Sequence, residues 1–568
     1  MIEKFDNTKP NVIILSDFGN FLGIQKTLGP YKIAHTLRQE GIEVVVLHHL
    51  HIFTVDEILH FLKHLVSDQT LFIGVSNYFY WNPEKLLHIN DKEFNLTFRD
   101  SGSFIPHGAQ YNEKIKSLVK EINPDCKFVV GGPDASDSEF NKDFDFVCLG
   151  FGEISMVNLT KFLLKEEPLR DFTRSIWGFK VLTNAKAEGY DFSESTMSYV
   201  EYDGVLRNDV LIIEIARGCI FKCAFCAYPL NGKKKLDYIR SKENIKKELL
   251  ENYYRYNVTS YVFGDDTLND SVEKCKMLYE ISKELPFKLK YKAYIRLDLL
   301  AAHPETIEYL FDGGLVAAHF GIETLNKKTA STIGKGGSRE KLTKTMNYIK
   351  EKYGDTVTLY GTFIFGLPYE SLESMKQTEE WLVSEDCPLD SFNTFPLSIA
   401  PLTNKIGSRG FLSDIDLNYE KYGYVNQGVV YLGEDVEGMT EHTQKLARVL
   451  NWKNEETDYK TVLQMTDKFN SEIVKKGDMK VKVDDAFILA SLGVPVKHFI
   501  NAKYNSLNLS GLDLLKMKRA TDYKNKMYSS LQVPFIKDSS PTDLLKKYKV
   551  FSNFLLDNAK EFVYNNNN

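Results

Sequence analysis

The stretch Ala216-Arg-Gly-Cys219-Ile-Phe-Lys-Cys223-Ala-Phe-Cys226-Ala places three cysteines close together in the pattern Cys-x3-Cys-x2-Cys. The whole chain of 568 residues contains only seven cysteines, so this grouping arises rarely by chance. An apolar run, Val210–Ile215, precedes it and predicts a buried strand. The cysteines are therefore expected in the loop that follows a strand of the core.

Three thiolates without a fourth partner favour an iron–sulfur cluster. Thiolates are soft ligands that suit such clusters and zinc. A structural zinc site takes four ligands, and no histidine or fourth cysteine lies beside these three in the sequence. Three cysteines would leave one iron of a [4Fe–4S] cluster with an open position for a substrate or cofactor. A zinc-binding knob and three clustered core cysteines are the alternative interpretations.

The composition narrows the classes of protein. The net charge of −6 argues against a general nucleic-acid binder. The longest apolar runs have the length of strands, well short of the roughly 20 residues that a membrane span needs. The first ten residues, MIEKFDNTKP, are polar and lack the pattern of a signal peptide. Sparse cysteines in an odd number indicate a reducing compartment, so we expect a cytoplasmic location without membrane contact.

Strands and helices alternate over residues 1–165, which predicts an α/β domain with an open, Rossmann-like parallel sheet. The expected strands are Asn11–Leu15, Glu43–Leu47, Leu71–Ser76, Lys127–Val130 and Phe146–Leu149. The expected helices include Gly29–Glu40 and Val55–Leu65. Ligands of such sheets bind beyond the carboxyl ends of the strands. Small residues at these ends are therefore candidate binding positions, namely Gly74, Ser76, Gly131, Gly132 and Gly150.

Residues 166–207 are polar and irregular and are expected to form a connector, with a short hairpin near Trp177–Leu182. Six further strands alternate with helices over residues 208–410, which predicts a partial (β/α)6 barrel with its site at the carboxyl ends of the strands. The six are Val210–Ile215, Tyr261–Phe263, Lys290–Ile295, Ala317–Ile322, Thr358–Phe365 and Ser391–Leu397. Residues 411–568 are expected to be mostly helical, with amphipathic helices near Glu441–Leu450 and Tyr459–Lys475.

Because Phe225 precedes the last cysteine, the motif becomes Cys-x3-Cys-x-aromatic-Cys, which resembles that of the radical S-adenosylmethionine (SAM) superfamily. The resemblance implies that Cys219, Cys223 and Cys226 hold a catalytic [4Fe–4S] cluster whose open iron chelates the amino and carboxylate groups of SAM. It implies that reduction of the cluster breaks a carbon–sulfur bond of SAM and yields a 5′-deoxyadenosyl radical. Phe225 is implied to pack beside the adenine.

Strand ends of the predicted barrel carry further residues that the resemblance assigns to SAM. Gly264, Asp265 and Asp266 follow the second strand, where relatives contact the methionyl amino group; an acidic helix N-cap is the alternative. Arg296 belongs to an Arg-x-Asp segment. Its guanidinium suits the carboxylate of SAM, but an ion pair with Asp298 is an equal alternative.

The fourth and fifth barrel strands complete the expected SAM site. Glu323 and Thr324 end a Gly-Ile-Glu-Thr segment that resembles the family's Gly-Ile-Glu-Ser, and they are expected to contact the ribose hydroxyls or the methionyl amine. Gly361 and Ile364 lie on a strand whose backbone runs along the adenine in the family. Lys335, in Ile333-Gly334-Lys335-Gly336, matches a recurring helix end and is expected to be structural.

The α/β domain before the barrel resembles the cobalamin-binding domain of B12-dependent radical SAM enzymes. The resemblance rests on the turns at Gly131-Gly132-Pro133 and Leu149-Gly150-Phe151-Gly152-Glu153, and it makes cobalamin a possible cofactor. The signature Asp-x-His-x-x-Gly, whose histidine ligates cobalt, is absent, and Ser16-Asp17-Phe18-Gly19 is the nearest segment. Many radical members of the group lack this signature too. A scaffold without cobalamin is therefore the alternative for this domain.

Three functional hypotheses follow. The first is a cobalamin-dependent radical SAM methyltransferase. The second is a cobalamin-free radical SAM enzyme that performs rearrangement, oxidation, cyclisation or sulfur insertion. The third is a non-catalytic iron–sulfur scaffold or sensor. For the enzymatic hypotheses we expect a small-molecule or peptide substrate and an external electron donor of the flavodoxin or ferredoxin type.

Overall fold

The computed structural model of the chain describes residues 9–16, 26–50, 53, 55–76, 108–132, 135, 141–182, 192–227, 238–401, 412–431, 448–475, 503–504 and 509–536. The chain divides into two compact units. Unit 1 comprises residues 1–188, 199–209 and 502–568, and unit 2 comprises residues 189–198 and 210–501. Within the described ranges, no helix combines the length and the apolar composition that a membrane crossing requires.

Unit 1 is built on a seven-stranded sheet in the order β2-β1-β3-β4-β5-β7-β6. All neighbouring strands run parallel except the hairpin of β6 and β7 at one edge. The strands are β1 Val12–Leu15, β2 Val44–Leu47, β3 Phe72–Ser76, β4 Lys127–Gly131, β5 Phe146–Cys148, β6 Phe172–Arg174 and β7 Lys180–Leu182. Both β1 and β2 are buried along their whole length, as strands covered on two faces require. The hairpin expected in the connector therefore belongs to this sheet.

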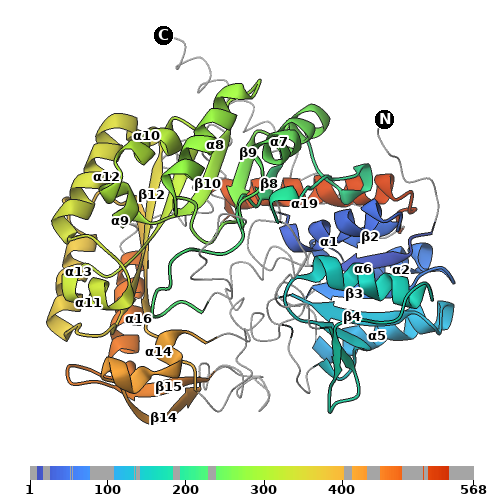
Figure 1. Ribbon diagram of the computed structural model, residues 1–568, viewed down its shortest axis with the longest axis horizontal. Helices are drawn as coiled ribbons and strands as arrows, with labels where there is room; N and C mark the ends of the chain where they lie inside the picture. The colour runs from blue at the N-terminus through green and yellow to red at the C-terminus, as the bar shows by residue number, and fades with distance from the viewer. Residues whose placement is uncertain are drawn as a thin grey trace. The chain divides into compact units, whose positions relative to one another are not determined.

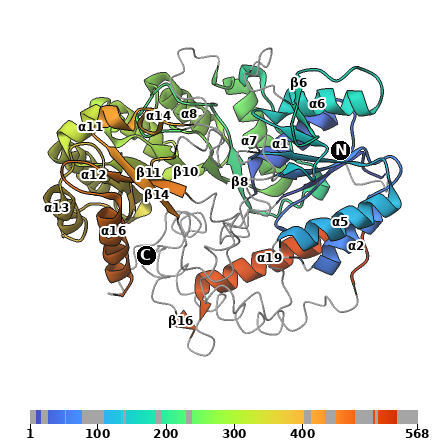
Figure 2. The ribbon, with the colours of Figure 1, turned by 90° about the horizontal axis from the view of Figure 1, so that it is seen from below.

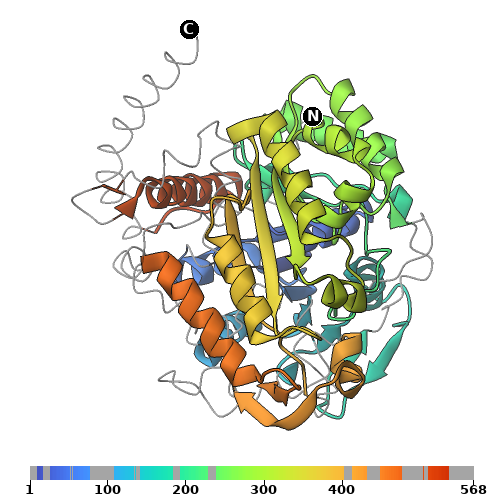
Figure 3. The same ribbon diagram turned by 90° about the vertical axis from the view of Figure 1, so that its left-hand side faces the viewer.

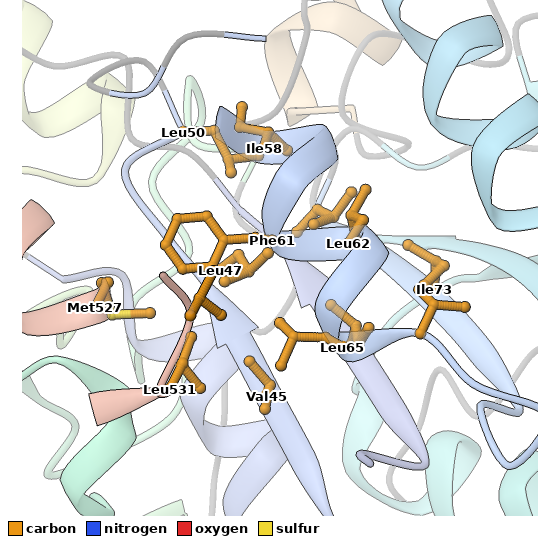
Figure 4. Packing of buried hydrophobic residues seen from close by; sticks show 14 of the residues in the cluster. Val45, Leu47, Leu50, Ile58, Phe61, Leu62, Leu65, Ile73, Met527 and Leu531 are labelled. Atoms are coloured by element: carbon orange, nitrogen blue, oxygen red, sulfur yellow. The ribbon is translucent and has the colours of Figure 1, made fainter. Parts of the chain in front are cut away.

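The helices of unit 1 include one from the far end of the chain. They are α1 Leu28–Gln39, α2 Val55–Leu65, α5 Gly108–Ile122, α6 Gly152–Leu163 and α19 Gly511–Ser530. One end of helix α19 lies beside α2 (Figure 2), and Lys524 of α19 pairs with Glu57 of α2 at 2.7 Å. Met527 and Leu531 enter the same hydrophobic core as Phe61 and Val45 (Figure 4). The C-terminal segment thus completes the core of the N-terminal sheet.

Unit 2 contains a six-stranded parallel sheet in the sequential order β13-β12-β11-β10-β9-β8 (Figure 1). Its strands are β8 Val210–Ile213, β9 Ser260–Phe263, β10 Lys290–Ile295, β11 Leu315–Glu323, β12 Thr358–Phe365 and β13 Ser391–Pro396. Sequential order with a helical crossover after each strand is the topology of a (β/α) barrel. The predicted six-stranded parallel arrangement is confirmed.

The crossover helices of unit 2 are α7 Lys242–Tyr256, α8 Val272–Glu284, α9 Leu297–Ala302, α10 Glu305–Phe311, α11 Lys327–Ile333, α12 Arg339–Tyr353 and α13 Leu372–Leu382. Several begin at a polar cap whose side chain accepts a hydrogen bond from the backbone of the first turn. These caps are Ser241, Ser271, Asn326, Ser338 and Ser371.

The chain after β13 mixes strands and helices. It contains α14 Asp414–Leu417, β14 Val425–Tyr431, β15 Arg448–Lys453 and α16 Tyr459–Lys475, followed in unit 1 by β16 Lys503–Tyr504 and β17 Leu509–Ser510. Helix α16 packs against β13 (Figure 3). Phe469 of α16 stacks on Phe392 of β13. The helix predicted at 459–475 is confirmed. The helix predicted at 441–450 is wrong for 448–450, which pair with β14 in an antiparallel hairpin; 441–447 lie outside the described residues.

The α/β fold class is therefore confirmed, with an N-terminal parallel sheet, a six-stranded parallel sheet and helices towards the C-terminus. The division into 1–165, 166–207, 208–410 and 411–568 stays a prediction about domains. The compact units differ from it because the hairpin β6–β7 and helix α19 both group with unit 1.

Candidate functional site

The cysteine loop follows β8 directly and is fixed to the end of the neighbouring strand β9. Asp265, just after β9, accepts hydrogen bonds from the backbone N–H groups of Ile215 at 3.2 Å and Ala216 at 2.6 Å. The backbone of Arg217 donates to the Tyr238 carbonyl at 3.0 Å. These bonds set the path of the chain immediately before Cys219.

Asp265 belongs to a buried network of charged and polar side chains. Lys274 of α8 lies 3.9 Å from the carboxylate of Asp265 and 2.6 Å from that of Asp270. Tyr238 donates its hydroxyl to Asp270 at 3.1 Å. Burial raises the pKa of Asp265 to about 7, against the opposing effects of Lys274 and the two backbone donors. A carboxylate held in this way serves first to position the loop.

Two of the three cysteines contact different parts of the barrel through their thiols, and the third bonds within the loop. Cys219 is buried, and its thiol donates to Thr267 Oγ1 at 3.4 Å. The Cys223 thiol is half-buried and donates to the Gly334 carbonyl at 3.7 Å. Cys226 is also half-buried, and its backbone N–H donates to the Cys223 carbonyl at 3.0 Å. The loop therefore presents three reduced thiols at the carboxyl end of β8.

The arrangement of these thiols bears on the kind of metal they suit. In the described part of the chain, no three His, Cys, Asp or Glu side chains converge closely enough to hold a metal ion. A single zinc ion needs its ligands to converge on one point, whereas a [4Fe–4S] cluster takes each thiolate on a different iron. Three thiols in one loop can therefore each hold a different iron of such a cluster.

Arg296 and Asp298, at the end of β10, form a forked ion pair beside the cysteine loop. Arg296 donates from Nε to Asp298 Oδ1 at 3.1 Å and from Nη2 to Oδ2 at 2.6 Å. Its Nη2 also donates to the Gly334 carbonyl at 3.0 Å, and its Nη1 to Cys223 Sγ at 3.6 Å. Burial opposes the charge on Asp298, but the bonds and charge of Arg296 outweigh it and lower the pKa of that carboxyl. The ion pair named as an alternative in the sequence is present.

Glu323 lies at the carboxyl end of β11 beside a lysine. Its Oε1 is 3.6 Å from Lys335 Nζ, which also donates to the Gly321 carbonyl at 2.8 Å. Burial raises the pKa of Glu323, while Lys335 and Arg296 counteract the shift. The backbone φ of Glu323 is +66°, a strained value for a residue with a side chain. Lys335 also lies 5.9 Å from the Phe225 ring centroid, so Phe225 and Glu323 border the same region.

Thr324, at the end of β11, bonds to a second buried carboxylate, that of Glu370. Its hydroxyl donates to Glu370 Oε1 at 2.5 Å. Glu370 Oε2 accepts from the backbone N–H groups of Gly366 at 3.1 Å and Leu367 at 3.2 Å. Burial raises the pKa of Glu370 to about 7. The pair ties the end of β11 to the turn after β12.

The remaining expected SAM positions of the barrel differ in exposure. Gly264 is exposed at the end of β9. Asp266 is half-buried, with its pKa raised to about 6 by burial and by the charge of Glu214. Ile364 is half-buried on β12. Gly361 is buried, and a Cβ there would meet Leu389 at 2.7 Å, so close packing is one reason for a glycine at that position.

In unit 1, the candidate positions lie at the carboxyl ends of β3, β4 and β5, except Gly74, which is buried in the middle of β3. Ser76 pairs with Gly131 across the sheet. Gly132 and Gly150 follow β4 and β5 with φ of +111° and +82°, values that glycine adopts without strain. A Cβ on Gly74 or Gly131 would meet its nearest neighbours at 3.5 Å, an ordinary contact. Packing against neighbouring protein atoms therefore does not force a glycine at position 74 or 131.

Several residues of the site were not singled out from the sequence. Thr267, Phe221 and Lys274 all contact the cysteine loop or its supports. Phe221 lies within the cysteine motif itself, and Thr267 directly follows the Asp-Asp pair, so proximity to known motifs was the available signal. Lys274 carried no such signal, because its role depends on the packing of α8 under β9.

Residues 213–382 match the family model of the radical SAM superfamily. The chain carries a radical SAM domain. Such a domain implies a [4Fe–4S] cluster and SAM as cofactors, as the resemblance of the cysteine motif predicted. The matched residues begin in β8 and end in α13, and they include the cysteine loop and the strand ends described above.

The relatives found are distant. An uncharacterized methyltransferase of Pyrococcus horikoshii is 24% identical over 290 residues, which are 46% of this chain and 59% of that protein. The match thus spans less than two thirds of this relative's length. The radical SAM methyltransferase TsrM from Kitasatospora setae, solved with cobalamin and a [4Fe–4S] cluster, has a TM-score of 0.59 at 13% identity and covers 92% of this chain and 100% of its own.

A second solved structure extends the comparison of folds. The cobalamin-dependent radical SAM enzyme OxsB, solved with aqua-cobalamin and SAM, has a TM-score of 0.54 at 14% identity. The superposition covers 96% of this chain and 84% of OxsB. At these identities the likeness shows a shared fold that extends over both units of the chain.

Proposed function

We propose that this chain is a radical SAM enzyme in which Cys219, Cys223 and Cys226 hold a [4Fe–4S] cluster that cleaves SAM reductively to a 5′-deoxyadenosyl radical. The observation that carries this proposal is the loop after β8. It presents three thiols and is anchored by Asp265, whereas no fourth cysteine lies beside it in the sequence. An iron without a protein ligand has the open position that an amino acid chelate needs.

The surrounding charges support the same proposal. Asp266 and Glu214 place carboxylates at the ends of β9 and β8, where a positively charged methionyl amino group would be stabilised. The Glu323–Lys335 pair, beside Phe225, offers a hydrogen-bond acceptor and donor to ribose hydroxyls. The aromatic ring of Phe225 provides an apolar surface for an adenine.

The cysteines provide the direct test. The variant with Cys219, Cys223 and Cys226 all changed to Ala is expected to lose cluster absorbance, bound iron and 5′-deoxyadenosine production under dithionite. Cys387→Ala is the matched control, because Cys387 is half-buried and lies far along the chain from the loop. Iron content and 5′-deoxyadenosine formation that persist in the triple variant would refute the proposal.

For the whole chain we propose a cobalamin-dependent methyltransferase. TsrM and OxsB, both solved with cobalamin, share the fold over more than nine tenths of this chain. When bound, cobalamin supplies a carrier for a methyl group. The residues that would contact it are Gly74, Ser76, Gly131, Gly132 and Gly150. Gly132 and Gly150 are exposed, Ser76 and Gly131 are half-buried, and Gly74 is buried.

Reconstitution with hydroxocobalamin followed by gel filtration tests this second step. The wild-type protein is expected to retain a corrinoid spectrum. Gly131→Val is expected to weaken retention by at least tenfold, because its side chain would occupy the ligand's space while its Cβ meets protein atoms only at 3.5 Å or more. Cluster content, which depends on unit 2, is the internal control. If the wild-type protein does not retain the corrinoid, the cobalamin proposal is wrong.

A cobalamin-free radical SAM enzyme is the second candidate. The observation in its favour is the missing Asp-x-His-x-x-Gly signature, since the nearest segment, Ser16-Asp17-Phe18-Gly19, lacks the histidine. It predicts SAM cleavage by a protein that retains no corrinoid. In either case we propose a cytoplasmic enzyme that takes electrons from a flavodoxin or ferredoxin and acts on a small molecule or peptide.

A further inference from the structure

Four contacts hold the Arg296 guanidinium in place, apart from the bond that its Nη1 makes. Two of its nitrogens bind Asp298, and Nη2 also reaches the Gly334 carbonyl at 3.0 Å. The guanidinium carbon lies 4.0 Å from the centroid of the Phe221 ring, a cation–π distance. Asp298 is fixed in turn by the backbone N–H of Gly336 at 2.9 Å. The orientation of the Arg296 fork is therefore determined by the protein.

The donor that remains, Nη1, points at a cluster ligand. It lies 3.6 Å from Cys223 Sγ, within hydrogen-bond range for sulfur. Cys223 also lies against the C-terminal end of α11, where the Ala224 N–H donates to the Ile333 carbonyl at 3.0 Å. The same turn, at Gly334, accepts a bond from Arg296. Arginine and cysteine are thus held against one common turn.

We propose that Arg296 is a positioning residue of the cluster, which donates a hydrogen bond to the Cys223 sulfur and raises the reduction potential of the [4Fe–4S] centre. The inference rests on the proposed function. It differs from the expectation that Arg296 binds the carboxylate of SAM, because Asp298 already occupies the bidentate face of the guanidinium.

The physical reason lies in the charge of the reduced cluster. Reduction adds one electron, so the sulfur ligands become more negative. A cation and an N–H donor at a ligating sulfur stabilise this form more than the oxidised form.

The experiment is potentiometry of the reconstituted cluster without SAM, followed by electron paramagnetic resonance of the reduced form. In Arg296→Gln we expect the ratio of reduced to oxidised cluster at a fixed potential to fall about tenfold, which corresponds to about 59 mV for one electron. Arg296→Lys keeps the charge but not the fork, so a smaller shift in the same direction is expected. Arg255→Gln is the matched control, since Arg255 pairs with Glu251 on α7.

The possible outcomes separate the inference from the proposed function. An unchanged SAM-free potential in a cluster-loaded Arg296→Gln protein overturns the inference, and weaker SAM binding in the same protein would assign Arg296 to the carboxylate of SAM instead. If Arg296→Gln does not assemble a cluster, Arg296→Lys decides the matter by the same measurement. A wild-type chain that assembles no cluster contradicts the proposed function itself.

Discussion

The two sheets of this chain carry different kinds of residue at the carboxyl ends of their parallel strands. In unit 2, the strand ends carry buried charged groups in close pairs, such as Arg296 with Asp298 and Lys335 with Glu323. In unit 1, the described ends of β3, β4 and β5 carry glycines and Ser76. Paired charges fix side chains around a small, charged cofactor, whereas small neutral residues expose backbone to a broad ligand. The same topology can therefore serve two kinds of binding.

The largest effect is expected from a change at Asp265, the carboxylate in unit 2 that anchors the loop before Cys219. Asp265→Asn is isosteric, but its amide group cannot accept from both Ile215 and Ala216 as the carboxylate does. The loop before Cys219 then loses an anchor, and we expect cluster content after reconstitution to fall severalfold. Iron and sulfide analysis measures it.

The matched control for that experiment is the neighbouring carboxylate. Asp266→Asn changes a half-buried side chain on the same strand end and is expected to keep the cluster. Equal loss of iron in both variants would mean that the negative charge at this edge, and not the anchoring of the loop, supports the cluster.

The second prediction concerns unit 1, where stability depends on a distant segment. Met527 of α19 is fully buried among residues of the N-terminal core (Figure 4). Met527→Ala should lower the free energy of unfolding by about 2–5 kcal/mol, because it leaves a cavity there. Denaturation followed by circular dichroism measures this change.

Ser529→Ala, an exposed position of the same helix, is the control and should change stability by less than about 0.5 kcal/mol. Cluster content should stay unchanged in both variants, because Met527 belongs to unit 1. A loss of cluster in Met527→Ala would show that the two units do not fold independently.

Local patterns were sufficient to predict most strands and several helices. Strands β1, β2 and β8 are continuous apolar runs. The predicted bounds of the helix 55–65 and of the strands 290–295 and 358–365 agree with the structure to the residue. The placement of α19 could not be predicted in the same way. Its apolar residues show that it packs somewhere, but its partner lies more than 400 residues earlier in the chain, and nothing local in either segment encodes that contact.

In the candidate site, too, some features could be predicted from sequence motifs and others depend on tertiary packing. The cysteines were found from their spacing, and the strand-end residues from the resemblance to the radical SAM superfamily. The choice between two partners for Arg296 was not, because it depends on where the turn at Gly334 lies relative to β10. The strained backbone at Glu323 and the support from Lys274 are likewise products of tertiary packing. Residue type indicated the chemistry, and the fold determined which groups meet.

The smallest expected effect is a pH dependence that arises in unit 2 from Glu370. Its pKa is about 7 in the folded protein, because burial disfavours the charged form, against 4.5 as the ordinary value. Below pH 4.5 the carboxyl is protonated in both states. As the pH rises from 4.5 to 7 only the unfolded state releases the proton, so unfolding becomes easier, by about 3 kcal/mol at most, and the effect levels off above pH 7.

Glu370→Gln should remove this slope, because a glutamine can still accept from Gly366 and Leu367 and pair with Thr324 without a titrating group. The measurement is urea denaturation at a series of pH values, followed by the fluorescence of the buried Trp381 and Trp452 of unit 2. The difference between wild type and variant isolates Glu370 from Asp265, which titrates in the same range. Glu373→Gln, on the exposed face of α13, is the matched control. Identical slopes in wild type and Glu370→Gln would mean that the pKa of Glu370 in the folded protein stays near its ordinary value. The Thr324 hydroxyl and the two backbone donors would then suffice to hold a charge in this part of the barrel.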